Sequence, residues 1–469
     1  MTNWLADCLV AAMPKPHHPD PEYHLAYVFE RFPSFTQTFC VREVLELERQ
    51  GLRPLLFSIR DTRDEVPRNF PDELYDRVIF LPEEKTLVED VKALKAGGEL
   101  PQCIVLTLRH WKEKADGRDK VRVYEAAWIG QKMLEHGVTH SHSHFAGVGA
   151  RTGWWLRFFY DFTFSFTGHA NDLWCPDDFA LSREMLFEDA SLIVTVSDYT
   201  VRDLNERFSA ATSKTKRVYN GLNLAPFQEV AEARNAGAVW KGDEAPLIFS
   251  VGRLIEKKGY DDLIRACGML KTQGRKFRCI IVGDGPMEDE LNAMISELGL
   301  ESEVELAGPK SQDEILEYLS GTAIFALPCV TEHDGGKDNL PTVIMEAMGA
   351  SVVCASTILA GVPEMIIDHE TGRLVPEREP EQFAEILADL LADPKRSEEM
   401  AALGKKRAEA LFAKEETAKQ MRRHLVRFGL VNYDPDLIAH DPELKAAFQS
   451  QKWMRFRRKF RRLKEERYA

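Results

Sequence analysis

The feature that most constrains the fold is an alternation of short apolar runs with longer amphipathic stretches along most of the chain. The apolar runs are rich in β-branched residues and have the length of strands, whereas the stretches between them repeat their apolar residues at helical spacing. This alternation is typical of parallel β-α-β units, because parallel strands need a crossover connection that is usually a helix. The sequence therefore predicts an α/β fold built on parallel sheets.

The strand-like runs fall into two series. The first predicts strands at 24–29, 52–58, 138–144, 162–167 and 192–196, with a helix at 36–50 and a longer charged, helical region between 82 and 133. The second predicts strands at 247–251, 279–282, 304–306, 323–327 and 352–355, with helices near 260–272, 286–298, 311–320 and 341–349.

A stretch rich in alanine, glutamate and glycine, residues 229–245, separates the two series and predicts a linker. We therefore expect two doubly wound, Rossmann-like domains, at 1–228 and 246–415. Ligands of such sheets bind beyond the carboxyl ends of the strands. A two-domain arrangement then places the site in the cleft where the domains face one another.

Composition narrows the class of protein. The 469 residues suffice for two domains, and no apolar run approaches the roughly 20 residues that span a bilayer. The start lacks the pattern of a secretory signal. The eight cysteines are scattered without close pairs, which fits a reducing compartment, so we expect a cytoplasmic protein. The net charge of −14 argues against general nucleic-acid binding.

The first informative motif directly follows the predicted strand 247–251. It runs from Gly252 and Arg253 to Lys258 and Gly259, so a guanidinium and an ammonium share one loop. Arg253 can fork two oxygens of a diphosphate, and Lys258 can act as a mobile point charge. Without further context, these two cations would indicate only an ordinary solvated loop. Their place between a strand and a helix start favours a binding role.

The second motif combines a helix start with two carboxylates. Pro341 suits the first position of a helix, with Asn339 or Leu340 as its cap. The free N–H groups and the dipole of such a helix attract an anion. Asp338 lies at the mouth of the helix and Glu346 more than one turn inside it, so they can bind hydroxyls at two ends of an extended ligand. The alternative is an ordinary helix that binds no ligand and whose N-terminal acid is stabilised by the helix dipole.

A third, weaker candidate is the turn formed by Gly283, Gly285 and Pro286 after the predicted strand 279–282. It can contact a phosphate, although a tight turn with proline at the helix start accounts for most of it. The third glycine of a dinucleotide fingerprint is missing, so NAD is not supported.

Together these motifs give the chain a resemblance to a known family. It is similar to retaining GT-B glycosyltransferases of family four, the group 1 glycosyltransferases, and within them to colanic-acid and other exopolysaccharide enzymes. The resemblance covers roughly residues 23–420. Besides the motifs above, it is carried by the segments 26–39, 144–147, 165–172, 197–199, 218–221, 282–286, 361–364 and 371–372.

The resemblance implies roles for individual residues. Arg253 and Lys258 would hold the donor diphosphate, and Glu346 would bind the ribose hydroxyls. Asp338 would contact the donor sugar where the family usually has Glu, and His169 would lie near the transferred sugar. The remaining expected substrate-binding positions are Gly252, Gly283, Gly285, Pro286, Asn339, Leu340, Pro341 and Asp172.

The resemblance also implies the reaction and its surroundings. A sugar would pass with retention from a nucleoside diphosphate sugar to a saccharide acceptor, often lipid-linked, for surface polysaccharide. The departing diphosphate would act as the base, and neither a cofactor nor a metal would be required. Residues 416–450 would carry a helix that returns to the first domain.

Two other functions stay open at this stage. A hydrolase or epimerase on the same fold would act on a nucleotide sugar without an acceptor. A catalytically silent scaffold or binding subunit is favoured by the substitution at Asp338 and opposed by the intact Arg253, Lys258, His169 and Glu346. The alternating His140, His142 and His144 also admit a metal site, although no acidic or cysteine partner stands near them in sequence.

The segment 451–469 is a basic tail. It carries nine lysines and arginines against two glutamates, with Trp453, Phe456, Phe460 and Leu463 at helical spacing. A basic amphipathic helix with aromatic anchors is typical of an element that lies on an anionic membrane surface. We therefore expect a peripheral association with the inner face of the plasma membrane, with packing on the acidic body as the alternative.

Overall fold

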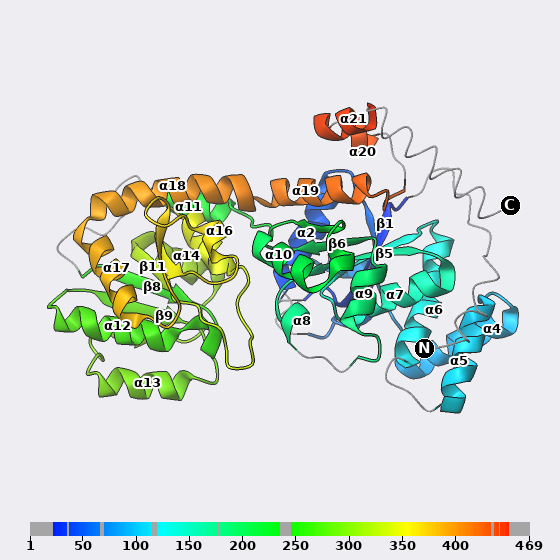
Figure 1. Ribbon diagram of the computed structural model, residues 1–469, viewed down its shortest axis with the longest axis horizontal. Helices are drawn as coiled ribbons and strands as arrows, with labels where there is room; N and C mark the ends of the chain where they lie inside the picture. The colour runs from blue at the N-terminus through cyan, green and yellow to red at the C-terminus, as the bar shows by residue number, and fades with distance from the viewer. Residues whose placement is uncertain are drawn as a thin grey trace.

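A computed structural model describes residues 22–34, 37–65, 70–114, 120–175, 179–234, 245–432, 436–439 and 441–449. In this part of the chain, two parallel sheets form the centres of two lobes, which lie side by side in Figure 1. The basic tail 451–469 lies outside the described residues. The predicted α/β class with two doubly wound domains is confirmed.

The described part of the first domain holds a seven-stranded sheet in the order β3-β2-β1-β4-β5-β6-β7. Its strands are β1 (Leu25–Arg31), β2 (Pro54–Arg60), β3 (Val78–Phe80), β4 (His140–His144), β5 (Thr163–Gly168), β6 (Leu192–Thr195) and β7 (Thr215–Arg217). Its helices are α2 (Thr38–Arg49), α3 (Asp72–Asp76), α4 (Glu84–Gly97), α5 (Gln102–Lys114), α6 (Lys120–Glu135), α7 (Val148–Tyr160), α8 (Asn171–Trp174), α9 (Arg183–Asp189) and α10 (Asp198–Arg207).

The described part of the second domain holds a six-stranded sheet in the order β10-β9-β8-β11-β12-β13. Its strands are β8 (Leu247–Val251), β9 (Arg278–Val282), β10 (Val304–Leu306), β11 (Thr322–Leu327), β12 (Val353–Thr357) and β13 (Gly372–Val375). Its helices are α12 (Tyr260–Thr272), α13 (Glu288–Glu297), α14 (Gln312–Gly321), α15 (Thr342–Gly349), α16 (Val362–Met365), α17 (Pro380–Ala392) and α18 (Pro394–Phe412). The strand order reverses between β8 and β11, which is where such sheets bind ligands.

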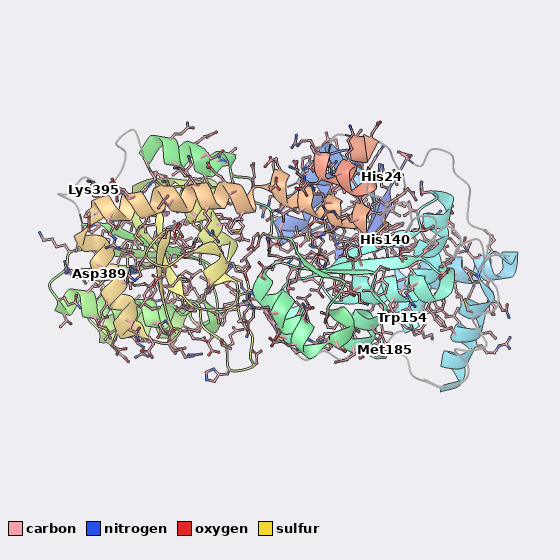
Figure 2. All side chains as sticks on the ribbon, turned by 45° about the horizontal axis from the view of Figure 1, so that its top comes forward. His24, His140, Trp154, Met185, Asp389 and Lys395 are labelled. Carbon is pink, nitrogen blue, oxygen red and sulfur yellow. The ribbon has the colours of Figure 1, made fainter. Side chains whose placement is uncertain are left out.

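Strands of the first sheet are buried on both faces, as expected where helices cover both sides. In β1, Ala26 and Val28 belong to the core beneath α7, whereas Leu25, Tyr27 and Phe29 belong to the core beneath α2. Strand β4 is unusual because it places three histidines and two serines in the buried sheet. Figure 2 shows His140 inside the first lobe, far from Asp389 in the second.

The connection between the domains differs from the predicted linker. Helix α11 (Ala225–Ala233) extends into 229–245, and its Phe227 packs into the core of the second domain. An amphipathic pattern too short to stand out explains why this helix was not expected. Residues 235–244 lie outside the described residues.

The chain returns to the first domain through α19 (Lys414–Arg427), which continues from α18 along the top of Figure 1. Ala418, Met421 and Leu425 of α19 are buried in the same core as α2 and β1. The helix is therefore a structural part of the first domain, although it follows the second in sequence.

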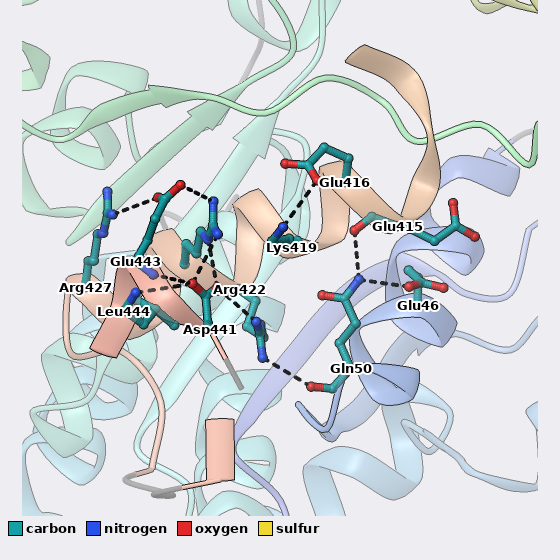
Figure 3. Close-up of polar contacts among 11 residues, drawn as sticks. Glu46, Gln50, Glu415, Glu416, Lys419, Arg422, Arg427, Asp441, Glu443 and Leu444 are labelled. Carbon is teal, nitrogen blue, oxygen red and sulfur yellow. Dashed lines mark hydrogen bonds and ion pairs between the residues drawn. The ribbon is translucent and has the colours of Figure 1, made fainter. Parts of the chain in front are cut away.

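Two short helices, α20 (Asp436–Ala439) and α21 (Pro442–Gln449), lie beside α19. Between them, the fully buried Asp441 carboxylate accepts hydrogen bonds from Arg422 Nη2 at 3.0 Å and from Arg423 Nε at 2.7 Å. Figure 3 labels Asp441 and Arg422 within this group of polar contacts. The Asp441 carboxylate also accepts from the backbone N–H groups of Glu443 and Leu444. Although burial raises the pKa of Asp441, these donors and charges lower it to about 2.

Candidate functional site

Three loops of the second domain meet at the carboxyl ends of β8, β9 and β11. The loops after β8 and β9 are joined by hydrogen bonds from Gly252 N to Val282 O at 2.9 Å and from Leu254 N to Asp284 O at 2.7 Å. A Cβ at Gly283 would lie 1.9 Å from Gly252 O, and one at Gly285 would lie 2.4 Å from Leu254 O. These glycines are therefore required by backbone packing, and Pro286 follows in the same turn.

The predicted cation and the predicted acid meet at this edge. Lys258 ends a short 3₁₀ turn, and its Nζ lies 2.6 Å from Asp338 Oδ2, while Lys257 Nζ lies 3.6 Å from Oδ1. The side chains of Lys258 and Asp338 are 13% and 18% exposed, so the pair is largely shielded from water. Burial alone raises the pKa of Asp338, but Lys258 and Lys257 lower it below its usual range.

Lys258 is held by the backbone around it. Gly259, which follows it, has a φ of 65°, and a Cβ there would lie 1.9 Å from Pro328 O. Burial lowers the pKa of Lys258, but Asp338 more than offsets this and raises it, so the ammonium stays charged. Arg253 differs: it is exposed, and its side chain has no hydrogen bond or ion pair with a described residue. Its guanidinium is therefore available to an incoming anion.

The helix after the acidic motif begins one residue later than expected. Helix α15 starts at Thr342 with Pro341 as its N-cap, and no side chain caps it. Leu340 is buried in the core of the second domain. Helix α15 thus starts shortly after Asp338, the partner of Lys258, and the free N–H groups of its first turn give the edge further positive character.

Glu346 lies inside α15 and is partly buried. Burial raises its pKa to about 7, against the opposite effect of Arg42 and Lys258. Arg42 comes from α2 of the first domain and donates from Nε to Gly221 O at 2.9 Å. The two domains therefore bring a cation and an acid to one place, a pairing that the sequence did not reveal.

Asn339 joins the two domains through its side chain. Its Oδ1 accepts from Ser197 Oγ at 2.6 Å, and its Nδ2 donates to His169 O at 2.8 Å. This places His169, at the end of β5, against the acidic motif of the second domain. The two motifs therefore lie in contact where the domains meet.

Asp172 organises the loop that carries His169. Its carboxylate accepts from the backbone N–H groups of Ala146 at 2.9 Å, Ala170 at 2.8 Å and His169 at 3.1 Å. The side chain is thus bound to the protein itself, and it lines a cavity of about 370 Å³ in the first domain. This cavity is also lined by Glu30, Arg31, Gln37, His144, Phe145, Gly147, Cys175 and Phe179.

A metal site at the strand histidines can be tested against their bonding. One ligand atom each of Glu43, His142 and His144 lies within 4.8 Å of the others. The two ring nitrogens of His142 already contact Ser165 Oγ at 2.7 Å and Thr167 Oγ1 at 3.1 Å. Because both nitrogens are committed to hydroxyl groups, His142 does not fit the role of a metal ligand.

A further domain contact was missed by sequence reasoning. The Glu364 carboxylate accepts from the backbone N–H groups of Asp198 at 2.8 Å and Tyr199 at 2.7 Å, at the start of α10 in the first domain. Tyr219 Oη donates to it at 3.1 Å. Lys337 Nζ also contacts Tyr199 Oη at 3.0 Å. The short motif 361–364 was recognised, but nothing in it shows that its acid caps a helix of another domain.

Comparison with known proteins defines the class. Residues 235–407 match the glycosyl transferases group 1 family, so the second domain is a group 1 glycosyltransferase domain. The two facing sheets have the GT-B fold: the structure of an Anabaena protein in complex with UDP has a TM-score of 0.62 at 18% identity, covering 86% of this chain and 99% of that one. Both expectations from the sequence, the family of this domain and the GT-B fold, are confirmed.

Two relatives resemble parts of the chain in sequence. A glycosyltransferase of Escherichia coli K12, provisionally named for colanic acid biosynthesis, is 41% identical over 32% of this chain and 37% of its own length. A GDP-mannose-dependent phosphatidylinositol monomannoside mannosyltransferase of Mycolicibacterium smegmatis is 30% identical over 46% of this chain and 57% of its own. The matched segments thus span less than two thirds of these relatives.

Within the described residues, no helix combines the length and the apolar character that a bilayer crossing requires.

Proposed function

We propose that the chain is a glycosyltransferase that moves a hexose from a nucleoside diphosphate sugar to a saccharide acceptor, with retention, in the synthesis of surface polysaccharide. The observation that carries the proposal is the cationic edge of the second domain, where Lys258, the exposed Arg253 and the start of α15 belong to loops that follow β8 and β11. Asp338 and Glu346 stand beside it, and His169 faces it from the first domain.

In this proposal, the edge stabilises charge that appears during the reaction. Breaking the bond between sugar and diphosphate increases the negative charge on the diphosphate, and cations already in place favour that state over the bound donor. Lys258 is held charged and largely out of water, which strengthens its effect. Arg253 would add a forked contact. No protein nucleophile is needed if the acceptor attacks on the face from which the diphosphate leaves.

The acids would bind the two ends of the donor. Glu346, inside α15, would accept hydrogen bonds from the ribose hydroxyls, and Asp338 would contact the sugar. Asp338 is one methylene shorter than the glutamate usual in the family, and it already pairs with Lys258. The pair would therefore hold both the sugar and the diphosphate at a fixed distance from each other. The turn of Gly283, Gly285 and Pro286 would approach the donor from the next loop.

The relatives support the donor and acceptor classes. The Anabaena structure contains UDP, and the M. smegmatis relative is named for GDP-mannose and a lipid-borne acceptor. A nucleoside diphosphate donor and a lipid-linked saccharide acceptor are accordingly proposed for this chain. A cofactor and a required metal have no part in the proposal.

The donor site is tested with a thermal-shift panel of nucleoside diphosphates, with and without magnesium. If only UDP or only GDP raises the melting temperature, and magnesium does not change this effect, the result supports the site and identifies the donor class. If none of them shifts the melting temperature, the silent-scaffold alternative gains support and the enzyme proposal is rejected.

The role of Lys258 is tested with Lys258→Ala. Loss of one fixed charge at a developing anion lowers turnover by roughly 10²–10³-fold, measured as transfer of labelled sugar. Lys257→Ala is the matched control, since Lys257 is the adjacent cation and lies 3.6 Å from Asp338. Unchanged turnover in Lys258→Ala, with a normal melting temperature, would remove Lys258 from the mechanism.

We further propose that the tail 451–469 holds the enzyme at an anionic membrane surface, near lipid-linked acceptors. Because Asp441 and Leu444 are buried against the first domain, the tail should be removed after Ser450, which leaves this contact in place. Sedimentation with anionic liposomes should be lost in the truncated protein and kept in the full chain. Equal sedimentation of both would assign the tail a structural role.

A further inference from the structure

A half-buried arginine of the first domain lies at the junction with the second. Arg42 belongs to α2, on the side of the first lobe that is nearer the second in Figure 1. Its Nε donates to Gly221 O at 2.9 Å. The next residue, Leu222, is buried in the core of the second domain, in one cluster with Met345 of α15. The guanidinium of Arg42 is therefore fixed where the chain enters the second domain.

The first turn of α2 reaches the same junction. Phe39 precedes Arg42 by three residues, so the two share one face of the helix. The ring centroid of Phe39 lies 4.6 Å from that of His169, and His169 O accepts from Asn339 Nδ2 at 2.8 Å. Asn339 comes shortly before α15. Contacts at two points thus turn this face of α2 toward α15, the helix that carries Glu346.

The charges of Arg42 and Glu346 act on each other across the junction. Burial lowers the pKa of Arg42, and Glu346 opposes this effect more than any other group does. Burial raises the pKa of Glu346 to about 7, and Arg42 opposes that rise more than Lys258 does. Glu346 is therefore under the influence of two cations, Lys258 from its own domain and Arg42 from the first.

Both groups keep hydrogen-bonding capacity that no described residue uses. A guanidinium has five N–H donors, and among the described residues Arg42 uses only Nε, toward Gly221. The Glu346 carboxylate accepts no hydrogen bond from a described residue, and it forms no ion pair with Arg42 or Lys258. Because unpaired charges are costly in a partly buried place, these open donors and this open acceptor indicate a site for a ligand.

The chemistry of the two groups favours hydroxyls over phosphate as their ligand. A hydroxyl donates its hydrogen to a carboxylate and accepts from a guanidinium through its lone pairs, so neighbouring hydroxyls satisfy both groups at once. A phosphate also accepts from the guanidinium, but the negative carboxylate repels it. In a nucleoside diphosphate the neighbouring hydroxyls are those of the ribose.

We infer that Arg42 is a substrate-binding residue that the first domain contributes to the nucleotide site, where its guanidinium donates to an oxygen of the ribose hydroxyls whose hydrogens Glu346 accepts. The assignment rests on the proposed function, because it extends the ribose role of Glu346. The nucleotide site of the second domain is then incomplete without α2. A nucleotide that lacks the ribose hydroxyls gains nothing from Arg42.

Calorimetric titration of the full chain tests this role, with UDP, GDP and their 2′,3′-dideoxy analogues as ligands. The titrations are run at pH 8, where Glu346 is mostly ionised. Arg42→Gln should bind the ribonucleotide roughly tenfold or more weakly than the wild type, because a hydrogen bond from a charged donor is lost. The dideoxy analogue should bind the wild type and Arg42→Gln with nearly equal affinity.

The two ligands separate this role from the others that an arginine could have. An equal loss for the ribonucleotide and the dideoxy analogue would overturn the inference, because Arg42 would then act on the diphosphate or on the structure of the site. Unchanged affinity for both would also overturn it, while the binding itself would still support the proposed donor site. If the wild type binds neither UDP nor GDP, the proposed function fails and this role with it.

Arg49→Gln is the matched control. Arg49 lies two turns further along α2, its side chain is 64% exposed, and it pairs with Glu46 on the same helix. Its removal should change neither affinity. If Arg42→Gln does not fold, Arg42→Lys provides the same comparison, because it keeps the positive charge and loses the planar fork. It should weaken the ribonucleotide and leave the dideoxy analogue unchanged, and an equal effect on both would again overturn the inference.

Discussion

At the scale of single residues, the candidate site keeps Glu346 where its charge is unfavourable. Burial raises its pKa to about 7, although Arg42 and Lys258 partly compensate. The folded protein therefore binds more protons at this group than the unfolded chain does between about pH 4.5 and 7. The stability of the free protein falls as the pH rises through this window, and the full cost is present above pH 7.

This leads to two opposite effects of Glu346→Gln. At pH 8 the variant should be more stable by about 1–2 kcal/mol, a value reduced from the full pKa difference because the side chain is partly exposed. Near pH 5 the gain should vanish. The same variant should bind nucleoside diphosphate more weakly, since an amide replaces the carboxylate proposed to hold the ribose.

Urea unfolding at pH 5 and pH 8, together with calorimetric titration of the nucleotide, measures both effects. Glu385→Gln is the control, because Glu385 is exposed on α17, away from the site, and should change neither quantity. A variant that gains no stability at pH 8 would show that Glu346 is not strained by burial. Unchanged nucleotide affinity would reject its ribose role.

At the scale of elements, the sequence predicted those strands whose apolar runs are long enough to stand out. Strand β8 was predicted with its observed bounds, and β5 within one residue. Three short strands, β3, β7 and β13, were missed. Strand β7 has the sequence Thr-Lys-Arg and forms because it pairs with β6, so its own residues carry no strand signal. Tertiary pairing decides such strands, and a local pattern cannot show it.

Some residues of the candidate site could likewise be predicted from a local pattern, and others could not. Arg253, Lys258 and Asp338 were predicted because each follows a predicted strand or opens a predicted helix, and parallel strands bring such loops to one edge. Arg42 and Glu43 were missed, since α2 has the pattern of an ordinary amphipathic helix and their partners lie far along the chain. Motif reading marked Asp172 but could not show that backbone N–H groups occupy its carboxylate.

The contact between α19 and the segment before α21 gives a prediction at this scale. Asp441 is fully buried between Arg422 and Arg423, and its pKa of about 2 lies below the usual value. Its contribution to stability is present above about pH 4 and is lost as the pH falls toward 2. Asp441→Asn removes the buried anion that Arg422 and Arg423 share, although Arg423 keeps its contact with Glu443, and should destabilise the protein by roughly 3 kcal/mol near pH 7.

Thermal and urea unfolding measure this loss, and nucleotide binding should stay unchanged because the contact lies on the first domain. Glu443→Gln is the matched control: Glu443 also pairs with Arg423 and Arg427, but it is 58% exposed. Its removal should cost less than about 1 kcal/mol. Equal effects of the two variants would contradict a special role for the buried Asp441.

At the scale of the whole molecule, the two domains are connected by α11, by the passage from α18 to α19, and by polar contacts across the cleft. Glu364 makes the most extensive of the contacts described above. Its two oxygens accept from the first backbone N–H groups of α10, where the helix dipole favours a negative charge, and Tyr219 adds a third donor. Asn339 contributes a neutral bridge to Ser197 and His169.

These contacts hold the donor edge of one domain against His169 of the other, so their removal should separate the domains without unfolding either. Glu364→Ala leaves the N–H groups of α10 to water and removes a charge-assisted contact worth roughly 1.5–3 kcal/mol. Its radius of gyration in small-angle X-ray scattering should increase. The melting temperature should change little, because the core of each domain remains intact.

Activity should respond in a way that identifies the cause. The nucleoside diphosphate part of the donor is proposed to bind mainly to loops of the second domain, so its affinity should be nearly unchanged in Glu364→Ala. Transfer should fall, because the proposed reaction needs His169 and an acceptor held by the first domain close to the donor edge. Glu370→Ala, at an exposed position of the same domain, is the control and should alter neither property. An unchanged radius of gyration combined with full transfer would show that Glu364 does not hold the domains together, and Asn339 would then be the contact to vary.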